Sequence, residues 1–214
     1  MDAFAATRLA IGTAFLLVAA ISDVRTRKVR DPLWIALGSI GLILLAVQLS
    51  LEPSDLATLA LLGSSAILFY AIFVGAPLFD EHGFHPRPLR LAPFALAAVL
   101  LVTPAAILGT GGVSLSQRTL ELYSMPVMVI VYQLFYRARL LHGGADAKAL
   151  IALTLLVPTY PDMILFPLFG PDPRVEGMLR VVFPFSLVIW VDAAVLFLAV
   201  PGVLLVVNGI RGHL

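Results

Sequence analysis

Long apolar segments separated by short polar stretches run through the whole chain. A helix needs about 20 mostly apolar residues to cross a bilayer, and seven segments approach that length. Their hydrophobicity runs around every face of the helix, which is typical of helices surrounded by lipid or protein. The sequence therefore predicts seven transmembrane helices, at 4–22, 33–51, 55–75, 91–110, 120–136, 147–168 and 183–207.

Two of these segments are unusual. The sixth contains Pro158, Pro161 and Pro167, and because proline disrupts the preceding turn we expect this helix to kink or break near its far end. The first segment resembles a signal peptide, but a basic loop follows it instead of a small-residue cleavage site. It is therefore predicted to stay as a membrane anchor.

Composition supports an integral membrane protein. Of the 214 residues, 60% are hydrophobic and 13% are charged, against about 45–50% and about 25% in ordinary soluble domains. The predicted fold class is all-α, a polytopic bundle of about seven spans in a single domain covering 1–214, and whether the native chain continues past Leu214 stays open. The absence of cysteine excludes disulfides and thiolate sites, and the net charge of +1 gives no reason to expect a nucleic-acid partner.

The distribution of Lys and Arg predicts the orientation, because cytoplasmic loops carry more of them. With the N-terminus outside, the outer side holds only Arg8, Arg118, Arg174 and Arg180. The inner side then holds Arg25, Arg27, Lys28, Arg30, Arg87, Arg90, Arg137, Arg139, Lys148 and Arg211. The stretches 23–31 and 142–148 of this multi-pass protein of the cell membrane are thus predicted to face the cytoplasm.

Asp23 and Asp146 are predicted to lie at the same membrane face, although they are far apart in the sequence. Asp23 ends the first span, where it can be solvated or paired with Arg25 or Arg27. Asp146 begins the sixth span, where the helix dipole favours a carboxylate. Gly143 and Gly144 can take φ values closed to other residues and let a backbone approach closely. A plain turn with Asp146 as the N-cap residue is the alternative interpretation.

The two motifs around these acids, "DVRTRKVRDPLW" from Asp23 and "GGADAKAL" from Gly143, resemble those of the prepilin and preflagellin peptidases. These are membrane aspartyl proteases with a Gly-x-Gly-Asp type motif. The archaeal form has a small apolar residue in place of the second glycine, as Ala145 does here, and a Lys two positions after the Asp. The resemblance extends through "ALIALTLLVPTYP" and is loose elsewhere.

The resemblance implies a catalytic pair, Asp23 and Asp146, with substrate contacts from Gly143, Gly144, Ala145 and Lys148. It implies neither a metal nor another cofactor. The expected partners are membrane lipid and pilin-like or archaellin precursors, whose short basic leader peptide is removed at the cytoplasmic face. The chain departs from the family in two ways: four predicted spans separate the aspartates instead of two, and "VRD" stands where bacterial members tend to carry Ile-Pro-Asn. Because the chain has no cysteine, the cysteine-rich zinc domain of many bacterial members is expected to be absent, and no N-methyltransferase activity is expected.

The chemistry of such a pair does not depend on the family. Two carboxylates a few ångströms apart share a proton, and the pair in pepsin titrates with apparent pKa values of about 1.5 and about 4.7. The ionised partner takes a proton from the attacking water while the protonated partner polarises the scissile carbonyl. The glycines are expected to let an extended substrate backbone pass beside Asp146. Lys148 is expected to hold the charge of the pair, to bind lipid phosphate or to snorkel to the interface.

Other polar residues offer alternatives. Asp192 lies within the last apolar segment, where a charge costs about 2.5–3.5 kcal/mol on insertion scales, so we expect a buried hydrogen bond to neighbouring helices. A transporter or proton channel that uses Asp192, or a presenilin-like intramembrane protease, is an alternative function. Asp162 is expected to face water. The loop with Asp80, Glu81, His82 and His85 is predicted to be solvated, because its Gly and Pro disfavour a zinc-binding helix.

Overall fold

Helices make up nearly all of the described structure. The computed structural model describes residues 3–75, 79–80, 83–84, 88–109, 116–141, 143–161 and 173–211. Its helices are α1 (Ala3–Thr26), α2 (Asp31–Leu51), α3 (Leu56–Phe73), α4 (Pro88–Gly109), α5 (Gln117–Arg137), α6 (Gly144–Leu156), α7 (Pro173–Val182) and α8 (Phe185–Ile210). Two short strands, β1 (Phe79–Asp80) and β2 (Gly83–Phe84), pair antiparallel in the segment that was predicted to be a loop. The predicted helical bundle is confirmed.

Five of the described helices, α1, α2, α3, α4 over Pro88–Ile107, and α8, have the length and composition needed to cross a membrane. This supports a membrane protein, while the number of spans and the outward N-terminus stay predictions. The sixth predicted span is the clearest difference. Its helix, α6, has 13 residues, or roughly 20 Å, and ends at Leu156, before Pro158. Residues 162–168 of that predicted span lie outside the described residues.

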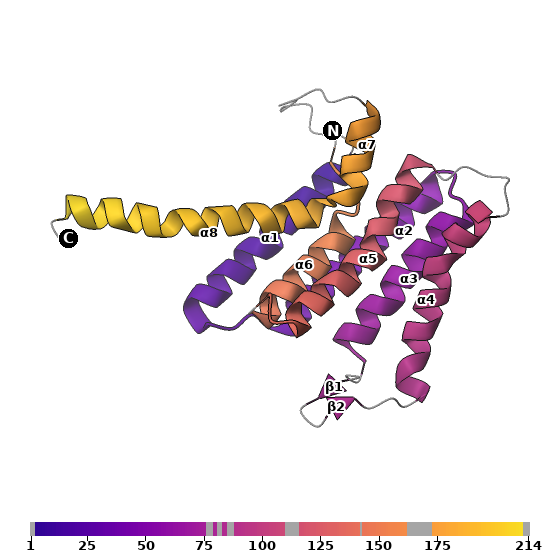
Figure 1. Cartoon of the computed structure of the whole chain (residues 1–214), viewed down its shortest axis with the longest axis horizontal. Helices are drawn as coiled ribbons and strands as arrows, with labels where there is room; N and C mark the ends of the chain where they lie inside the picture. Colours follow the sequence, from indigo (N-terminus) through magenta and orange to yellow (C-terminus); the bar gives the residue numbers. More distant parts are fainter. Residues whose placement is uncertain are drawn as a thin grey trace.

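The short helix α6 lies at the centre of the arrangement (Figure 1). It packs against α2, α5, α1 and the beginning of α8, while α3 contacts α2, α4 and α5. The long helix α8, yellow in Figure 1, then leaves the bundle, and its residues from 191 onward are almost all exposed. The amphipathic helix α7 beside α5 was not predicted from the sequence.

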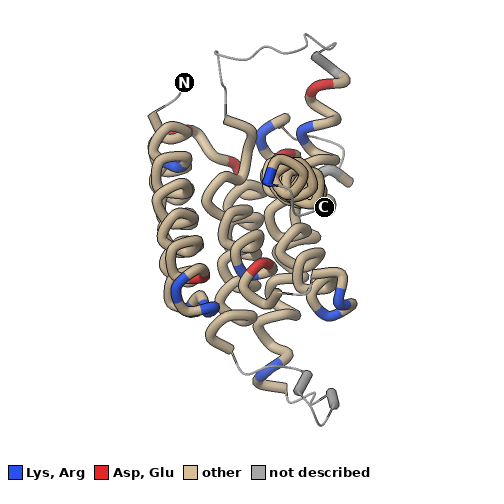
Figure 2. Tube along the Cα trace, turned by 90° about the vertical axis from the view of Figure 1, so that its left-hand side faces the viewer, with Lys and Arg blue, Asp and Glu red and all other residues tan. Residues whose placement is uncertain are grey.

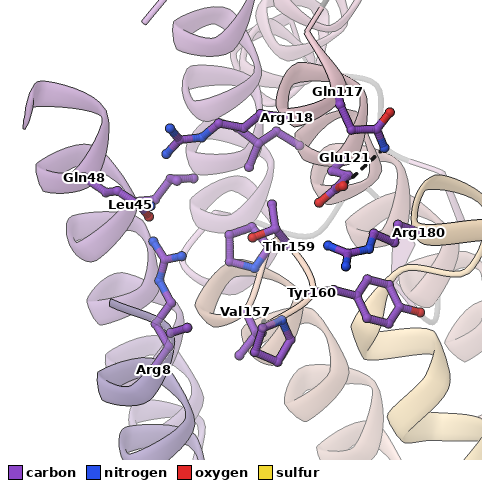
Figure 3. Close-up of a pocket in the computed structure, with 14 residues that line it drawn as sticks. Arg8, Leu45, Gln48, Gln117, Arg118, Glu121, Val157, Thr159, Tyr160 and Arg180 are labelled. Carbon is purple, nitrogen blue, oxygen red and sulfur yellow. Dashed lines mark hydrogen bonds between the residues drawn. The ribbon is translucent and has the colours of Figure 1, made fainter. Parts of the chain in front are cut away.

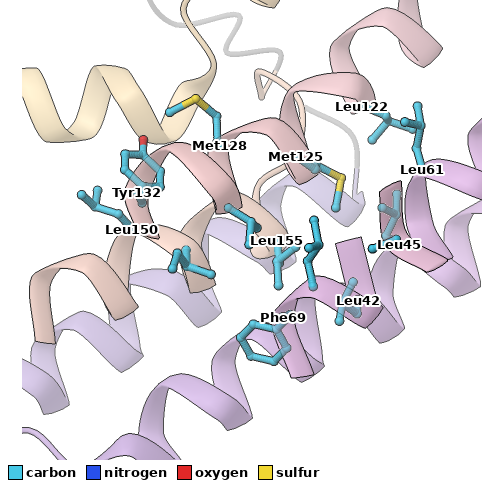
Figure 4. Close-up of a cluster of buried hydrophobic side chains, with 14 of the residues drawn as sticks. Leu42, Leu45, Leu61, Phe69, Leu122, Met125, Met128, Tyr132, Leu150 and Leu155 are labelled. Carbon is cyan, nitrogen blue, oxygen red and sulfur yellow. The ribbon is translucent and has the colours of Figure 1, made fainter. Parts of the chain in front are cut away.

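The main core cluster lies between α2, α3, α5 and α6 (Figure 4). Lipid chains are as apolar as leucine, so in a membrane such contacts stabilise the bundle through dense packing more than through removal from water. The side chains with almost no exposed surface include Leu45, Leu61, Phe69, Leu122, Met125, Tyr132 and Leu155.

Small residues on α2 bring helix backbones into contact. A Cβ atom at Gly41 would lie 2.6 Å from the carbonyl oxygen of Leu155 and from the Cα of Leu156, both backbone atoms of α6. A Cβ at Gly38 would overlap the ring of Phe69 on α3. Close approach through glycine is a common way for membrane helices to associate, and here it fixes α2 against α6.

Polar side chains add hydrogen bonds between these helices. Ser39 of α2 shares one with Tyr70 of α3 at 2.8 Å. Near the beginning of α8, the hydroxyls of Tyr132 and Thr154 both contact the buried Ser186, at 3.0 and 2.9 Å. Such bonds contribute about 0.6 kcal/mol each on average in a membrane protein, and the second set joins α5, α6 and α8.

Gly41→Ala should destabilise the protein because the new methyl group meets backbone atoms that cannot rotate away. We expect a loss of about 1–3 kcal/mol, the usual cost of overpacking, measured as a lower thermal midpoint in detergent. The matched control is Gly202→Ala on α8, where no atom lies within 4 Å of the added Cβ. That variant should be neutral or slightly stabilised, and an equal loss in both variants would contradict the α2–α6 contact.

Candidate functional site

Asp23 and Asp146 lie at one end of the bundle. The helices α1 and α5 end there, and α2 and α6 begin there (Figure 1); we call it the aspartate end and the opposite one the far end. Charged residues of the bundle helices gather towards these two ends (Figure 2). The prediction that the two acids share one side of the fold therefore agrees with the path of the helices.

Asp23 is an exposed residue in the last turn of α1, and hydrogen bonds fix the turn that follows it. The hydroxyl of Ser22 donates to the carbonyl oxygen of Lys28 at 2.9 Å, and that of Thr26 donates to the same oxygen at 3.0 Å. Arg27 adopts a positive φ of 54°, a conformation in which a helix commonly ends. Within the described residues, no ion pair joins Asp23 to Arg25 or Arg27.

Asp146 is the third residue of α6 and not its N-cap, so the N-cap interpretation is wrong. Gly143 is the N-cap, and its carbonyl oxygen accepts a hydrogen bond from the backbone N–H of Asp146 at 3.1 Å. The acid thus lies in the first turn, where the helix dipole favours its anionic form. Both this carboxylate and that of Asp23 are accessible to solvent.

The two glycines before Asp146 have different surroundings, and neither has a φ in the left-handed region. A Cβ at Gly143, whose φ is −95°, would overlap the Asp146 carboxylate. A Cβ at Gly144 would make only ordinary contacts with Tyr136, the nearest at 3.4 Å. The expectation of unusual φ values is therefore wrong. At Gly143 the Asp146 side chain occupies the space of a Cβ, so a larger residue there would displace the carboxylate.

The charges of the two aspartates interact. Partial burial raises the pKa of Asp146, which precedes the predicted sixth span, and the negative charge of Asp23 raises it further. Both effects disfavour a second negative charge at this site. The carboxylate of Asp23 thus acts on an acid more than a hundred positions away in the sequence, and Asp146 holds its proton more tightly than an isolated aspartic acid.

Lys148 does not pair with Asp146. Its Nζ lies 2.6 Å from Oδ1 of Asp31, in the first turn of α2, so the expectation that Lys148 holds the charge of the aspartate pair is not supported. The ion pair is partly exposed and contributes at most about 1 kcal/mol, but it joins the beginnings of α2 and α6. Ala145 lies half-buried between Gly144 and Asp146.

The remaining predicted polar residues lie elsewhere. Asp192 is exposed on α8, so the expected burial against neighbouring helices is wrong. Glu81, His82, His85 and Asp162 lie outside the described residues. In the part of the chain that the structure describes, no cluster of three or more His, Cys, Asp or Glu side chains could hold a metal ion.

Sequence reasoning missed two contacts of this site. The ion pair between Lys148 and Asp31 could have been predicted from the sequence, because these opposite charges lie at the beginnings of two helices that are predicted to share a membrane face. The contact between Gly143 and the Asp146 carboxylate has no signal in the sequence, because it depends on the side-chain rotamer of Asp146.

Comparison of the chain with protein-family models, curated proteins and solved structures finds no match in any of them.

The raised pKa of Asp146 predicts how stability depends on pH. The group titrates higher in the folded state than its ordinary value of 3.8, so the folded state binds the proton more tightly than the unfolded state, and wild-type stability falls as pH rises from 3.8 through the raised pKa. An asparagine at this position would not titrate. The thermal midpoint of Asp146→Asn should therefore rise relative to wild type as the pH increases through this window. In Asp23→Asn the pKa of Asp146 should be raised less, so the pH range over which stability falls should be narrower. A difference between Asp146→Asn and wild type that does not vary with pH would contradict the assignment.

Proposed function

We propose that this chain is a membrane aspartic endopeptidase in which Asp23 and Asp146 activate water for the hydrolysis of a peptide bond. The observation that carries the proposal is that the last turn of α1, with Asp23, and the first turn of α6, with Asp146, lie at the same end of the bundle, where the charge of Asp23 contributes to the raised pKa of Asp146. A carboxyl group whose pKa is perturbed by a second carboxylate is a frequent feature of active sites. The resemblance of the two motifs to those of prepilin and preflagellin peptidases supports peptide-bond hydrolysis as the reaction.

The difference between the two acids assigns their roles. Asp146 keeps the shared proton because partial burial and the charge of Asp23 raise its pKa, and it donates a hydrogen bond to the scissile carbonyl oxygen. Asp23 accepts a proton from water as the water oxygen bonds to the carbonyl carbon. The oxyanion takes the proton of Asp146, and the amide nitrogen takes the proton held by Asp23. The C–N bond then breaks while one hydroxyl proton of the gem-diol returns to Asp146, which gives a carboxylic acid and an amine and restores the starting state of the pair.

The substrate class follows from the resemblance: a type IV pilin-like or archaellin precursor with a short basic leader before a hydrophobic helix. The surface of α1 beside Asp23 fits such a helix. A hollow of about 340 Å³ lies along Ala20, Ile21, Val24 and Arg25, and Ile21 and Val24 are exposed. A hydrophobic segment arriving through the lipid would pack there and bring its leader to Asp23.

The location is part of the proposal. With seven spans and the N-terminus outside, the bias of Lys and Arg puts the aspartate end at the cytoplasmic face of the cell membrane, where basic leaders of precursors are found before translocation. A transporter that uses Asp192 has less support, because this residue is exposed on the part of α8 that leaves the bundle. It therefore lines no passage between the described helices.

Asp23→Asn and Asp146→Asn should each abolish cleavage of a precursor while leaving the protein folded, because each removes a proton-transfer group. The measurement is conversion of a purified pilin-like precursor in lipid, read by mass spectrometry, with circular dichroism as the check of folding. Asp192→Asn is the matched control and should cut at the wild-type rate. Full activity in Asp23→Asn or Asp146→Asn would contradict the assignment of these two acids as the catalytic pair. Loss of activity only in Asp192→Asn would favour a site at Asp192.

The glycines give a second test of the same site. Gly143→Ala should lower the cleavage rate at least about tenfold, because the added methyl group displaces the Asp146 carboxylate, and even a shift of about 1 Å can be costly. Gly144→Ala should keep most of the activity, because its methyl group makes only ordinary contacts with Tyr136. The measurement compares cleavage rates at equal amounts of folded protein. The reverse order of the two variants would mean that Gly144, and not Gly143, controls access to Asp146.

A further inference from the structure

Three arginines from three helices meet at a cavity at the far end of the bundle (Figure 3). Arg8 comes from α1, Arg118 from α5 and Arg180 from α7. The cavity has a volume of about 330 Å³ and is also walled by α2 and by the segment 157–161. Its volume lies within the range of about 300–1,000 Å³ that is usual for small-molecule sites.

The sequence makes this convergence informative. Positive charge is concentrated on the inner side of the predicted topology, and only four arginines fall on the outer side. Three of those four line one cavity. Membrane proteins carry more Lys and Arg on the cytoplasmic side. Outer arginines that come from distant segments to line one cavity therefore indicate a common binding role.

Burial and pairing differ among the three arginines. Arg8 is only 4% exposed. Arg118 pairs with Glu52, and Arg180 pairs with Glu176 at 2.5 Å; the side chains of these two acids are 44% and 43% exposed. A guanidinium carries five N–H donors in a planar fork, more than one carboxylate accepts, and the three arginines together bring three positive charges to the cavity.

The other walls are polar. Gln117 is held in place by a hydrogen bond to the carbonyl oxygen of Gly177 at 3.0 Å, and it donates to Glu121 at 3.2 Å. The guanidinium of Arg180 lies 5.8 Å from the centre of the Tyr160 ring, which orients it towards the cavity (Figure 3). Glu121, 8% exposed, is the one acid among the described residues that line the cavity.

We propose that this cavity binds a phosphate-bearing anion, with Arg8 at its base and Arg118 and Arg180 at its sides. Guanidinium forks match the oxygens of phosphate and hold them with charge-assisted hydrogen bonds. The cavity lies at the far end of the bundle, and in the predicted topology this end reaches the level where lipid head groups meet water. The phosphate can therefore belong to a lipid head group or to a soluble molecule. The proposal is independent of the aspartate pair at the other end.

The experiment offers the two sources to the purified protein in detergent. Phosphatidylglycerol is added in one arm, with diacylglycerol as the lipid that lacks phosphate, and binding is read by native mass spectrometry. Inorganic phosphate is added in the other arm, and binding is read from the rise of the thermal midpoint. Phosphatidylglycerol bound in preference to diacylglycerol identifies a lipid site, and stabilisation by inorganic phosphate identifies a soluble ligand. If neither phosphatidylglycerol nor inorganic phosphate binds, the proposal is overturned.

Charge variants separate this cavity from general attraction of anions. Arg8→Gln and Arg180→Gln should each weaken binding at least about tenfold, the effect of losing one charged hydrogen bond. Arg139→Gln, which changes an exposed arginine just after α5 at the aspartate end, should leave phosphate binding unchanged. Glu121→Gln should strengthen phosphate binding by removing the negative charge on the wall. If Arg8→Gln fails to fold, Arg180→Gln and Glu121→Gln still decide. Unchanged binding in Arg180→Gln and Glu121→Gln, or an equal loss of binding in Arg139→Gln, overturns the proposal.

Discussion

The contact between the backbones of α2 and α6 is the constraint on which the rest of the structure depends. Gly41 lets α2 touch the last residues of α6, and the ion pair between Lys148 and Asp31 joins the beginnings of the same two helices. The short helix is thus held against α2 near both of its ends. Because the turn after Asp23 leads directly into α2, this contact also fixes where the end of α1 lies relative to the beginning of α6.

The coupling of the aspartates follows from that geometry. The first turn of α6 carries Asp146, and Gly143 leaves room for its carboxylate beside the backbone. The end of α1 brings the charge of Asp23 within range, and the pKa of Asp146 rises. No bound metal is needed to explain this perturbation, because burial and a neighbouring carboxylate both act in the same direction. The raised pKa of Asp146 fits the role of the proton donor that we propose for it.

The sequence predicted the features that depend on hydrophobicity and on single residues. The apolar segments became helices, the break of the sixth segment came before Pro158, and Asp23 and Asp146 came to the same end because helices alternate in direction. Pairwise contacts were not predictable in this way. The partner of Lys148 and the role of Gly143 depend on side-chain geometry, and hydropathy alone does not show that the middle of α8, with Asp192, leaves the bundle. The helix α7 was missed because its ten residues are too short and too polar to be predicted as a span.

Cleavage of a precursor by the wild-type protein as a function of pH tests the central proposal most directly. The protein would be incubated in lipid with a type IV pilin-like precursor, and the mass of the product would identify the new N-terminus. The account predicts cleavage after the basic leader, with a rate that falls at low pH, where both carboxyls are protonated, and at high pH, where both are ionised. The absence of any new N-terminus across the pH range in which the protein stays folded would contradict it.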